Sequence, residues 1–395
     1  NKIIKDLNIE SLLAEQRRIL SKLVSFDTTS CNSNIGIIEF ITSYFENFKI
    51  SPIAVRNIEA NKVALYATIG PNVEGGVVFS AHTDTVPANP KEWKFNPLRL
   101  TEVNRRYYGL GSVDMKGFIS IILSLIPYFQ YMATVRPIHI ALSYDEEVGC
   151  LGVRPLLKSM QQEVAKPSLV IVGEPTEQII VNSHKSCYTF NTIFKGKEAH
   201  SSNPDWGLNS ITYAAKFIDK IDEVSRDILL EEKINKNFNP PNTTLNIGKI
   251  IGGKAHNIVP SNCEIIWSLR VLPGTNADEI IQKIENLKLE ILERCMQPLY
   301  KDADIQTEMI SSILALDTKI DSPALDFMKK ILNDDRIESV SYGTDGGFFS
   351  KVGWPTLVCG PGNIKQAHQP NEYINIEDIE NYMKFVIKLA NELNA

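Results

Sequence analysis

A short apolar run at residues 77–81 (VVFSA) is followed at once by a histidine and then by an aspartate. The run contains β-branched residues and lies between two glycines and a turn, which is typical of a buried strand. His82 and Asp84 are two residues apart on an extended chain, so their side chains share a face. Asp114 follows a glycine-punctuated turn, a loop position from which a carboxylate can point at an ion. Together these residues suggest a metal site.

Apolar strands and helices alternate along much of the chain. Several of the strands end on glycine, proline or an acidic cluster, and this is the pattern of an α/β fold with a mostly parallel sheet flanked by helices. We predict strands at residues 62–69, 77–81, 138–143, 169–172 and 356–359. Apolar residues at helical spacing predict helices at residues 12–26, 37–48 and 376–393.

The pattern changes between residues 184 and 312. Strands are predicted there at residues 188–194, 244–250, 264–271 and 305–310, and helices at 211–229 and 277–295. Their β-α-β-β-α-β order is that of a small α+β domain. A chain of 395 residues is also long for a single core. We therefore expect a catalytic domain formed by residues 1–183 and 313–395, with a second domain inserted at 184–312.

Composition excludes several classes of function. The formal net charge is -6 and no basic stripe is present, so neither nucleic acid nor an anionic membrane is an expected partner. The six cysteines are scattered without a CxxC pair, which argues against a disulfide framework and a thiolate zinc site. Residues 1–18 lack the apolar core of a signal peptide, and the apolar stretch at 118–129 is too short to span a bilayer. We expect a soluble, cytoplasmic protein.

Three further predicted strands lead into acidic residues or a histidine. The residues in these positions are Glu146, Glu147, Glu174 and, after a loop, His368. An open α/β sheet places its ligand crevice at the carboxyl ends of its strands. Each motif alone is more often an acidic turn or a strand-ending loop, but four of them at strand ends favour a site. Carboxylates this close cannot all stay ionised without a cation, and two divalent ions would resolve the conflict.

Longer motifs connect these residues to a known family. The strings are SAHTDTVP, YGLGSVDMKGF, DEE, GEPT, EAHSSNPDWGLNSI, GGKAHNIVP, SLRVLPG, GTDGGF and GPGNIKQAHQPNEYI. Their order and spacing over residues 61–374 resemble the dinuclear-zinc metallopeptidase family, which includes acetylornithine deacetylase, succinyl-diaminopimelate desuccinylase and aminoacylases.

The resemblance implies two Zn²⁺ ions, and Co²⁺ would fit the same imidazole and carboxylate ligands. The implied ligands are Asp114 between the two ions, His82 and Glu174 on one ion, and Glu147 and His368 on the other. Asp84 would then grip the His82 imidazole from behind. Glu146 would be the general base, taking a proton from the attacking water and giving one to the leaving amine.

The resemblance also implies the substrate contacts. His200, on the inserted domain, would polarise the scissile carbonyl, in the family usually from the partner subunit. Asn257 and Arg270 would hold the substrate carboxylate, a task that suits the fork of a guanidinium. Asp345, which follows Thr344 in a glycine-flanked loop, either accepts the substrate ammonium or forms an Asx-type turn with its own backbone.

The activity that the resemblance implies is zinc-dependent hydrolysis of the N-acetyl amide of N2-acetyl-L-ornithine, giving acetate and L-ornithine for arginine biosynthesis. A homodimer through the inserted domain is expected. Two alternatives within the same fold are a succinyl-diaminopimelate desuccinylase and a broader N-acyl-amino-acid hydrolase. A desuccinylase needs an additional cation for its second substrate carboxylate, and the sequence does not place one. A non-enzymatic metal-binding scaffold would have no need of Glu146.

Overall fold

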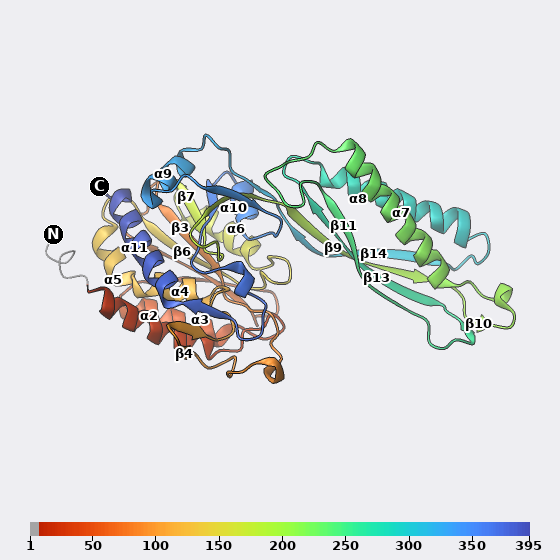
Figure 1. Ribbon diagram of the computed structural model, residues 1–395, viewed down its shortest axis with the longest axis horizontal. Coiled ribbons are helices and arrows are strands. Elements are labelled where there is room, and N and C mark those ends of the chain that lie inside the picture. Colours follow the sequence, from red (N-terminus) through yellow and green to blue (C-terminus); the bar gives the residue numbers. More distant parts are fainter. Residues whose placement is uncertain (1–7) are drawn as a thin grey trace. The chain divides into compact units, whose positions relative to one another are not determined.

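The computed structural model describes residues 8–395, which form two compact units (Figure 1). The first takes the chain up to Ser183, then Leu316–Ser339 and Thr344–Ala395. The second takes His184–Ala315 together with Val340–Gly343. The spacing of apolar residues does not predict that Val340–Gly343 belongs to the second unit. None of the helices within residues 8–395 is long and apolar enough to cross a membrane.

A nine-stranded sheet organises the first unit, in the order β1-β2-β6-β3-β7-β17-β8-β15, with β16 paired to β8. The strands are β1 Ile53–Arg56, β2 Val63–Ile69, β3 Val77–His82, β6 Ile138–Ser143, β7 Leu169–Val172, β8 Ile180–His184, β15 Leu316–Asp317, β16 Ile337–Val340 and β17 Thr356–Val358. The four central strands β6, β3, β7 and β17 run parallel, which confirms the α/β prediction where the site lies.

The outer parts of this sheet are antiparallel, so the sheet as a whole is mixed. β1 pairs with β2, β2 with β6, and β17 with β8 in this sense. β1 and β2 are joined by a short loop closed by a hydrogen bond from Asn57 N to Lys62 O, 3.0 Å long. A connection this short permits only an antiparallel pair, since parallel neighbours need a long crossover.

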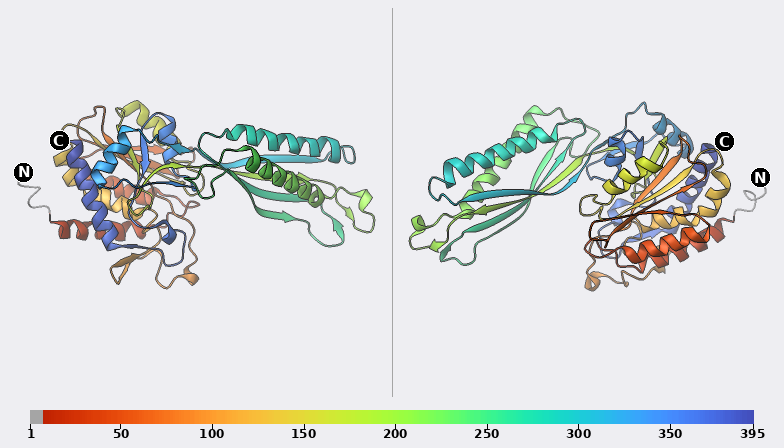
Figure 2. Two further views of the ribbon diagram at one scale, coloured as in Figure 1. Left: turned by 45° about the horizontal axis from the view of Figure 1, so that its top comes forward. Right: turned by 180° about the vertical axis from the view of Figure 1, so that it is seen from behind.

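Helices cover the central sheet, some of them by packing on other helices (Figure 2). They are α2 Ile9–Val24, α3 Ile35–Asn47, α4 Lys116–Ser124, α5 Ile126–Met132, α6 Val153–Glu163, α9 Pro323–Leu332, α10 Gly346–Lys351 and α11 Ile376–Leu393. Every residue of α4 is buried, and its Phe118 packs between Phe79 of β3 and Tyr382 of α11. This covering explains why the central strands are continuous apolar runs. A small sheet of β4 Thr101–Val103, β5 Arg106–Tyr108 and β18 Tyr373–Asn375 completes the unit, with short helices η1 Pro90–Glu92 and η4 Ile364–Gln366.

The second unit is an antiparallel sheet in the order β11-β13-β9-β14, with two helices on one face (Figure 1). Its elements are β9 Ser186–Lys195, α7 Ser210–Glu231, β11 Thr244–Gly252, β13 Asn262–Val271, α8 Ala277–Glu290, η3 Ile291–Met296 and β14 Asp304–Ile313. These show the predicted β-α-β-β-α-β order. Burial alternates along β13, as in a sheet with one covered face, and Trp267 stacks on Phe190 in the core with 4.2 Å between ring centres. The pair β10 Ala199–His200 and β12 Ile258–Val259, and the turn η2 Pro204–Trp206, were not predicted.

Candidate metal centre and active site

The predicted site residues of the first unit meet at the carboxyl ends of its parallel strands. His82 is the last residue of β3, Glu146 and Glu147 come three and four residues after the end of β6, and Glu174 comes two residues after the end of β7. His368 lies in the loop after β17. Because these strands are parallel neighbours, their carboxyl ends lie at one edge of the sheet. This is the position where open α/β sheets bind ligands.

Asp114 lies between two histidines. Its Oδ1 is 3.0 Å from His82 Nε2, and its Oδ2 is 3.3 Å from His368 Nε2. His82 Nε2 is also 3.5 Å from Glu174 Oε1, while His368 Nε2 is 3.0 Å from Glu147 Oε1. The structure thus brings all five predicted ligands together, in two sets that share Asp114.

Two groups of these residues offer ligand atoms within 4.8 Å of one another. One group is His82, Asp114 and Glu147, and the other is His82, Glu146 and Glu174. Glu174 Oε1 is buried and has no hydrogen-bond partner among the described residues. A buried carboxylate oxygen without a donor is unfavourable unless a cation or a proton satisfies it. The donor set and this orphaned oxygen both fit divalent metal ions.

The many carboxylates of the site also favour a bound cation. Hydrogen bonds with Asp114 and a second carboxylate raise the pKa of His368 to about 10. Burial opposes a charge on His82, yet hydrogen bonds to carboxylates raise its pKa well above the usual value. Burial first, and neighbouring carboxylate charges second, raise the pKa of Glu146 and Glu174 well above their ordinary values. A bound cation would balance the charges of these neighbouring carboxylates.

Asp84 supports two parts of the site. Its main-chain oxygen is 3.0 Å from His82 Nδ1, closer than its carboxylate Oδ1 at 3.4 Å. The carboxylate instead accepts hydrogen bonds from the backbone N–H groups of Glu146 and Glu147, at 3.1 and 3.2 Å, and from Ser30 Oγ at 2.7 Å. Asp84 therefore orients the imidazole mainly through its carbonyl and fixes the acidic turn with its side chain. The prediction from sequence included only the first of these roles.

A buried ion pair holds the same acidic turn, and no pattern in the sequence indicates it. Asp145 has φ 52°, in the left-handed region that non-glycine residues rarely occupy. Its Oδ1 lies 2.6 Å from Lys62 Nζ, which also donates to Ser30 O at 2.7 Å. Lys62 looks like an ordinary residue at the start of a strand, so only the folded chain shows that it reaches the site.

Glu372 is a second residue that sequence reasoning missed. It is buried, and its carboxylate accepts hydrogen bonds from the backbone N–H groups of Gly111, Val113 and Asp114 at 2.9, 2.9 and 3.0 Å. It therefore holds the loop that presents Asp114. Burial, and then the charge of Asp114, raise the pKa of Glu372 to about 8. Its position four residues after His368, inside the motif GPGNIKQAHQPNEYI, was the available signal.

Asp345 is almost fully buried, with 2% of its surface exposed. Its Oδ2 accepts a hydrogen bond from Ser143 Oγ, 2.5 Å away at the end of β6. The adjacent turn is closed by Thr344, whose Oγ1 accepts from Gly346 N at 3.0 Å. The carboxylate of Asp345 is thus directed at β6. Cys150 lies nearby, with its Sγ 3.8 Å from Glu146 Oε1.

The remaining predicted residues lie in the second unit. His200, on β10, is exposed, and its Nδ1 is 2.7 Å from Ser202 Oγ. Asn257 is close to it in the chain fold, since Ser201 N donates to Asn257 O at 3.0 Å. Arg270, exposed on β13, donates to Ser341 O at 3.0 Å.

His200 and Arg270 lie at opposite ends of the four-stranded sheet. Arg270 is paired with Cys187 at the start of β9, whereas β10 follows the other end of β9, where Lys195 pairs with Asn262. Asn262 and Arg270 are eight residue steps apart along β13, which corresponds to roughly 27 Å at about 3.4 Å per residue. One copy of this unit therefore cannot place both side chains on one small substrate.

Comparison with known proteins decides the family. The model described as "Peptidase family M20/M25/M40" matches residues 78–392. The chain belongs to this family. It is 32% identical over 382 residues to an acetylornithine deacetylase of Buchnera aphidicola subsp. Acyrthosiphon pisum, covering 95% of this chain and 97% of the relative.

Solved structures of the M20 family share the fold. An M20 family metallo-carboxypeptidase from Sulfolobus solfataricus superposes with a TM-score of 0.76 at 17% identity, over 96% of this chain and 99% of that one. A dinuclear metal-binding M20 peptidase of Bacillus subtilis gives a TM-score of 0.66 at 14% identity, over 98% and 99%. The protein is a hydrolase of this family, and its site has the donors for a metal centre.

Proposed function

We propose that the protein hydrolyses the N-acetyl amide of N2-acetyl-L-ornithine to acetate and L-ornithine. The observation that carries the reaction class is the placement of Asp114 between two histidine–carboxylate sets, with Glu146 beside them. The substrate rests on the identity with acetylornithine deacetylases along nearly the whole chain. A role in arginine biosynthesis follows from the product.

The proposed cofactor is a pair of Zn²⁺ ions, with Co²⁺ as a substitute. His82 and Glu174 would hold one ion, His368 and Glu147 the other, and Asp114 both; the donor set of imidazole and carboxylate suits these metals. When bound, such ions supply Lewis-acid polarisation of the amide and activation of water. Glu372 and Lys62 would keep the ligand loops in place, as partners behind the ligands commonly do.

Glu146 is the proposed general base. Its carboxylate is buried among the ligands, its backbone N–H is fixed by Asp84, and burial raises the pKa of its carboxyl well above the usual range. A raised pKa brings a carboxylate closer to the ideal strength for accepting and returning a proton near neutral pH. It would take the proton of the attacking water and deliver it to the amine as the C–N bond breaks.

We also propose a homodimer in which the second unit supplies the contact. His200 and Arg270 are too far apart within one chain to share a substrate, so two copies are needed if both serve one active site. The sheet has exposed apolar residues at its edges, with Ile250 and Ile251 on β11 and Met309 and Ile310 on β14. Open strand edges of this kind pair readily with another chain.

A cytoplasmic location is proposed with this function, because all six cysteines are free thiols. The deciding experiment is hydrolysis of N2-acetyl-L-ornithine, compared with N-succinyl-diaminopimelate, with and without a chelator. We expect turnover of the first substrate, loss of activity with the chelator and recovery when Zn²⁺ or Co²⁺ is added. Faster turnover of the succinyl compound would instead assign the protein to the desuccinylases.

A further inference from the structure

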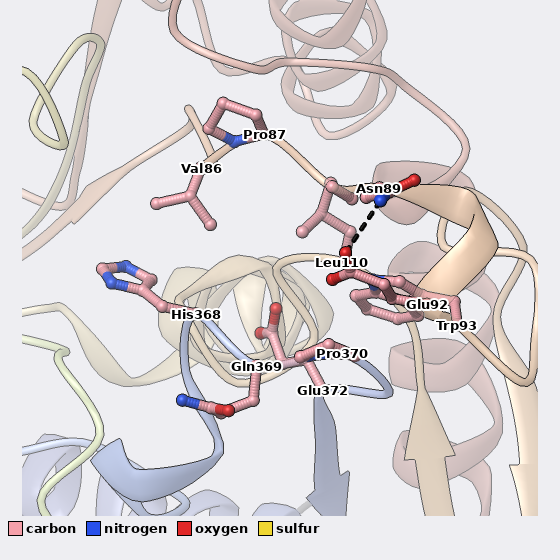
Figure 3. A pocket seen from close by; sticks show the side chains of 11 residues that line it. Val86, Pro87, Asn89, Glu92, Trp93, Leu110, His368, Gln369, Pro370 and Glu372 are labelled. Atoms are coloured by element: carbon pink, nitrogen blue, oxygen red, sulfur yellow. Dashed lines mark hydrogen bonds between the residues drawn. The ribbon is translucent and has the colours of Figure 1, made fainter.

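A pocket adjoins the candidate metal centre on the side of His368 (Figure 3). The cavity has a volume of about 90 Å³, and His368 forms part of its wall. The opposite part of the wall is the loop after β3, which includes the short helix η1. A molecule bound at the metal centre can therefore extend a side chain into this pocket.

The walls of the pocket carry both polar and apolar surface. Val86, Pro87, Trp93, Leu110 and Pro370 contribute hydrocarbon or aromatic surface, while Asn89 and Gln369 contribute amides. The apolar side chains suit methylene groups, which gain free energy when they leave water. The indole of Trp93 would add attraction for a cation near its ring.

A single carboxylate lies at the end of the pocket away from His368 (Figure 3). It belongs to Glu92, which accepts a hydrogen bond from Asn89 Nδ2 at 2.8 Å, while Asn89 Oδ1 accepts from Lys91 N at 3.3 Å. The turn thus holds the glutamate in place. None of the described residues that line the pocket is a lysine or an arginine. Glu372 also lines it, but its carboxylate already accepts three backbone N–H groups.

The two walls of the pocket are connected. Lys94 N, in the loop that carries Glu92, donates a 2.6 Å hydrogen bond to Asn371 Oδ1 in the loop that carries His368. The distance between the candidate ligand and the carboxylate is therefore set by the fold. A preformed pocket loses less free energy to ordering when it binds.

We propose that this pocket binds the side chain of the substrate, with Glu92 receiving a terminal ammonium group. The inference rests on the proposed function and specifies how its site selects a substrate. Apolar side chains along the wall, with the Glu92 carboxylate at the far end and no cation in the lining, fit a short aliphatic chain with a positive end, which is the side chain of ornithine. They disfavour a second substrate carboxylate, which would meet Glu92 without a cation. Glu92 thereby takes the role that the sequence predicted for Asp345.

The test compares Glu92→Gln with the wild-type enzyme on two matched substrates. N-acetyl-L-norleucine has a methyl group where N2-acetyl-L-ornithine has its ammonium. The substitution keeps the shape of the side chain and its bond from Asn89, and removes only the charge. We expect kcat/KM for the ornithine compound to fall about tenfold or more, and that for the norleucine compound to change less than about twofold, because a charge-assisted hydrogen bond is lost only for the former. Glu46→Gln, an exposed glutamate on α3 outside the pocket, is the control.

Binding of the products gives a readout that does not depend on turnover. Calorimetry should show L-ornithine binding weakened in Glu92→Gln and L-norleucine binding unchanged. Equal losses for both compounds, or a wild-type enzyme that prefers the norleucine substrate, would overturn the pocket assignment while leaving the hydrolase function standing. A wild-type enzyme that hydrolyses neither substrate would contradict the proposed function, and the pocket assignment would fall with it.

Discussion

The Lys62 ammonium lies 2.6 Å from Asp145 Oδ1, and both side chains are buried. Asp145 immediately precedes Glu146 and adopts a left-handed backbone conformation. A residue in that conformation persists only where its surroundings hold it. The ion pair therefore helps to orient Glu146, the proposed base, and Glu147, the proposed ligand that follows it.

Removing one partner of this pair should be costly. We expect Lys62→Met to lower the free energy of unfolding by about 3–5 kcal/mol, because the Asp145 charge would remain buried and unpaired. The double variant Lys62→Met with Asp145→Asn should recover a large part of this loss, as measured by urea unfolding. If the double variant is no more stable than the single one, the pair does not act as a unit.

Replacing Glu146 by Gln should separate chemistry from metal binding. The shape of the side chain is kept and its capacity to accept a proton is lost, so kcat should fall by about two to four orders of magnitude. Metal analysis of the purified variant should show nearly wild-type content. Loss of both ions in this variant would make Glu146 a ligand instead of a base.

His368→Ala should reduce the metal content at one site. The histidine belongs to one of the two sets that share Asp114, so the other set keeps its donors. We expect the metal-to-protein ratio after dialysis to fall from two toward one, since a lost ligand weakens the site it served. His256→Ala, which removes an exposed histidine of the second unit, should leave the ratio unchanged. A fully loaded His368→Ala protein would exclude His368 from the ligands.

The buried histidine of β6 gives a pH dependence that is independent of the site. Burial lowers the pKa of His139 to about 4 from its ordinary 6.5, and its Nδ1 is 2.9 Å from Thr68 Oγ1. His139 therefore binds a proton less readily in the folded state than in the unfolded state. Well above pH 6.5, His139 is neutral in both the folded and the unfolded state; between pH 6.5 and 4, each fall of one pH unit lowers the free energy of unfolding by up to about 1.4 kcal/mol. His139→Gln should lose about 1 kcal/mol less than wild type between pH 6.5 and 5.5 in urea unfolding, because the unfolded histidine is only half protonated at pH 6.5. The exposed His256→Gln serves as the control.

The sequence predicted those parts of the molecule that are formed by continuous stretches of residues. The central strands are unbroken apolar runs because both of their faces are covered, and the polar residues that end them were read directly from the chain. Lys62 and Glu372 could not be assigned in this way, since each acts through a fold contact with a distant segment. The sequence also does not show in which direction a buried side chain points. The hydrogen bond that Asp345 accepts from Ser143 is an example.

The placement of His200 and Arg270 at opposite ends of one sheet leads to the last prediction. If each active site takes His200 from the partner subunit, then His200→Ala and Glu146→Gln homodimers are both inactive, but a mixed dimer contains one site with both residues intact. Random exchange of subunits at equal amounts should restore roughly a quarter of wild-type activity, because about half of the dimers are mixed and half of their sites are complete. Subunit exchange is verified by native mass spectrometry of differently tagged chains, and mixtures of each variant with itself serve as controls. Absence of recovery after verified exchange would place His200 in the same subunit as the Glu146 it serves, or outside catalysis.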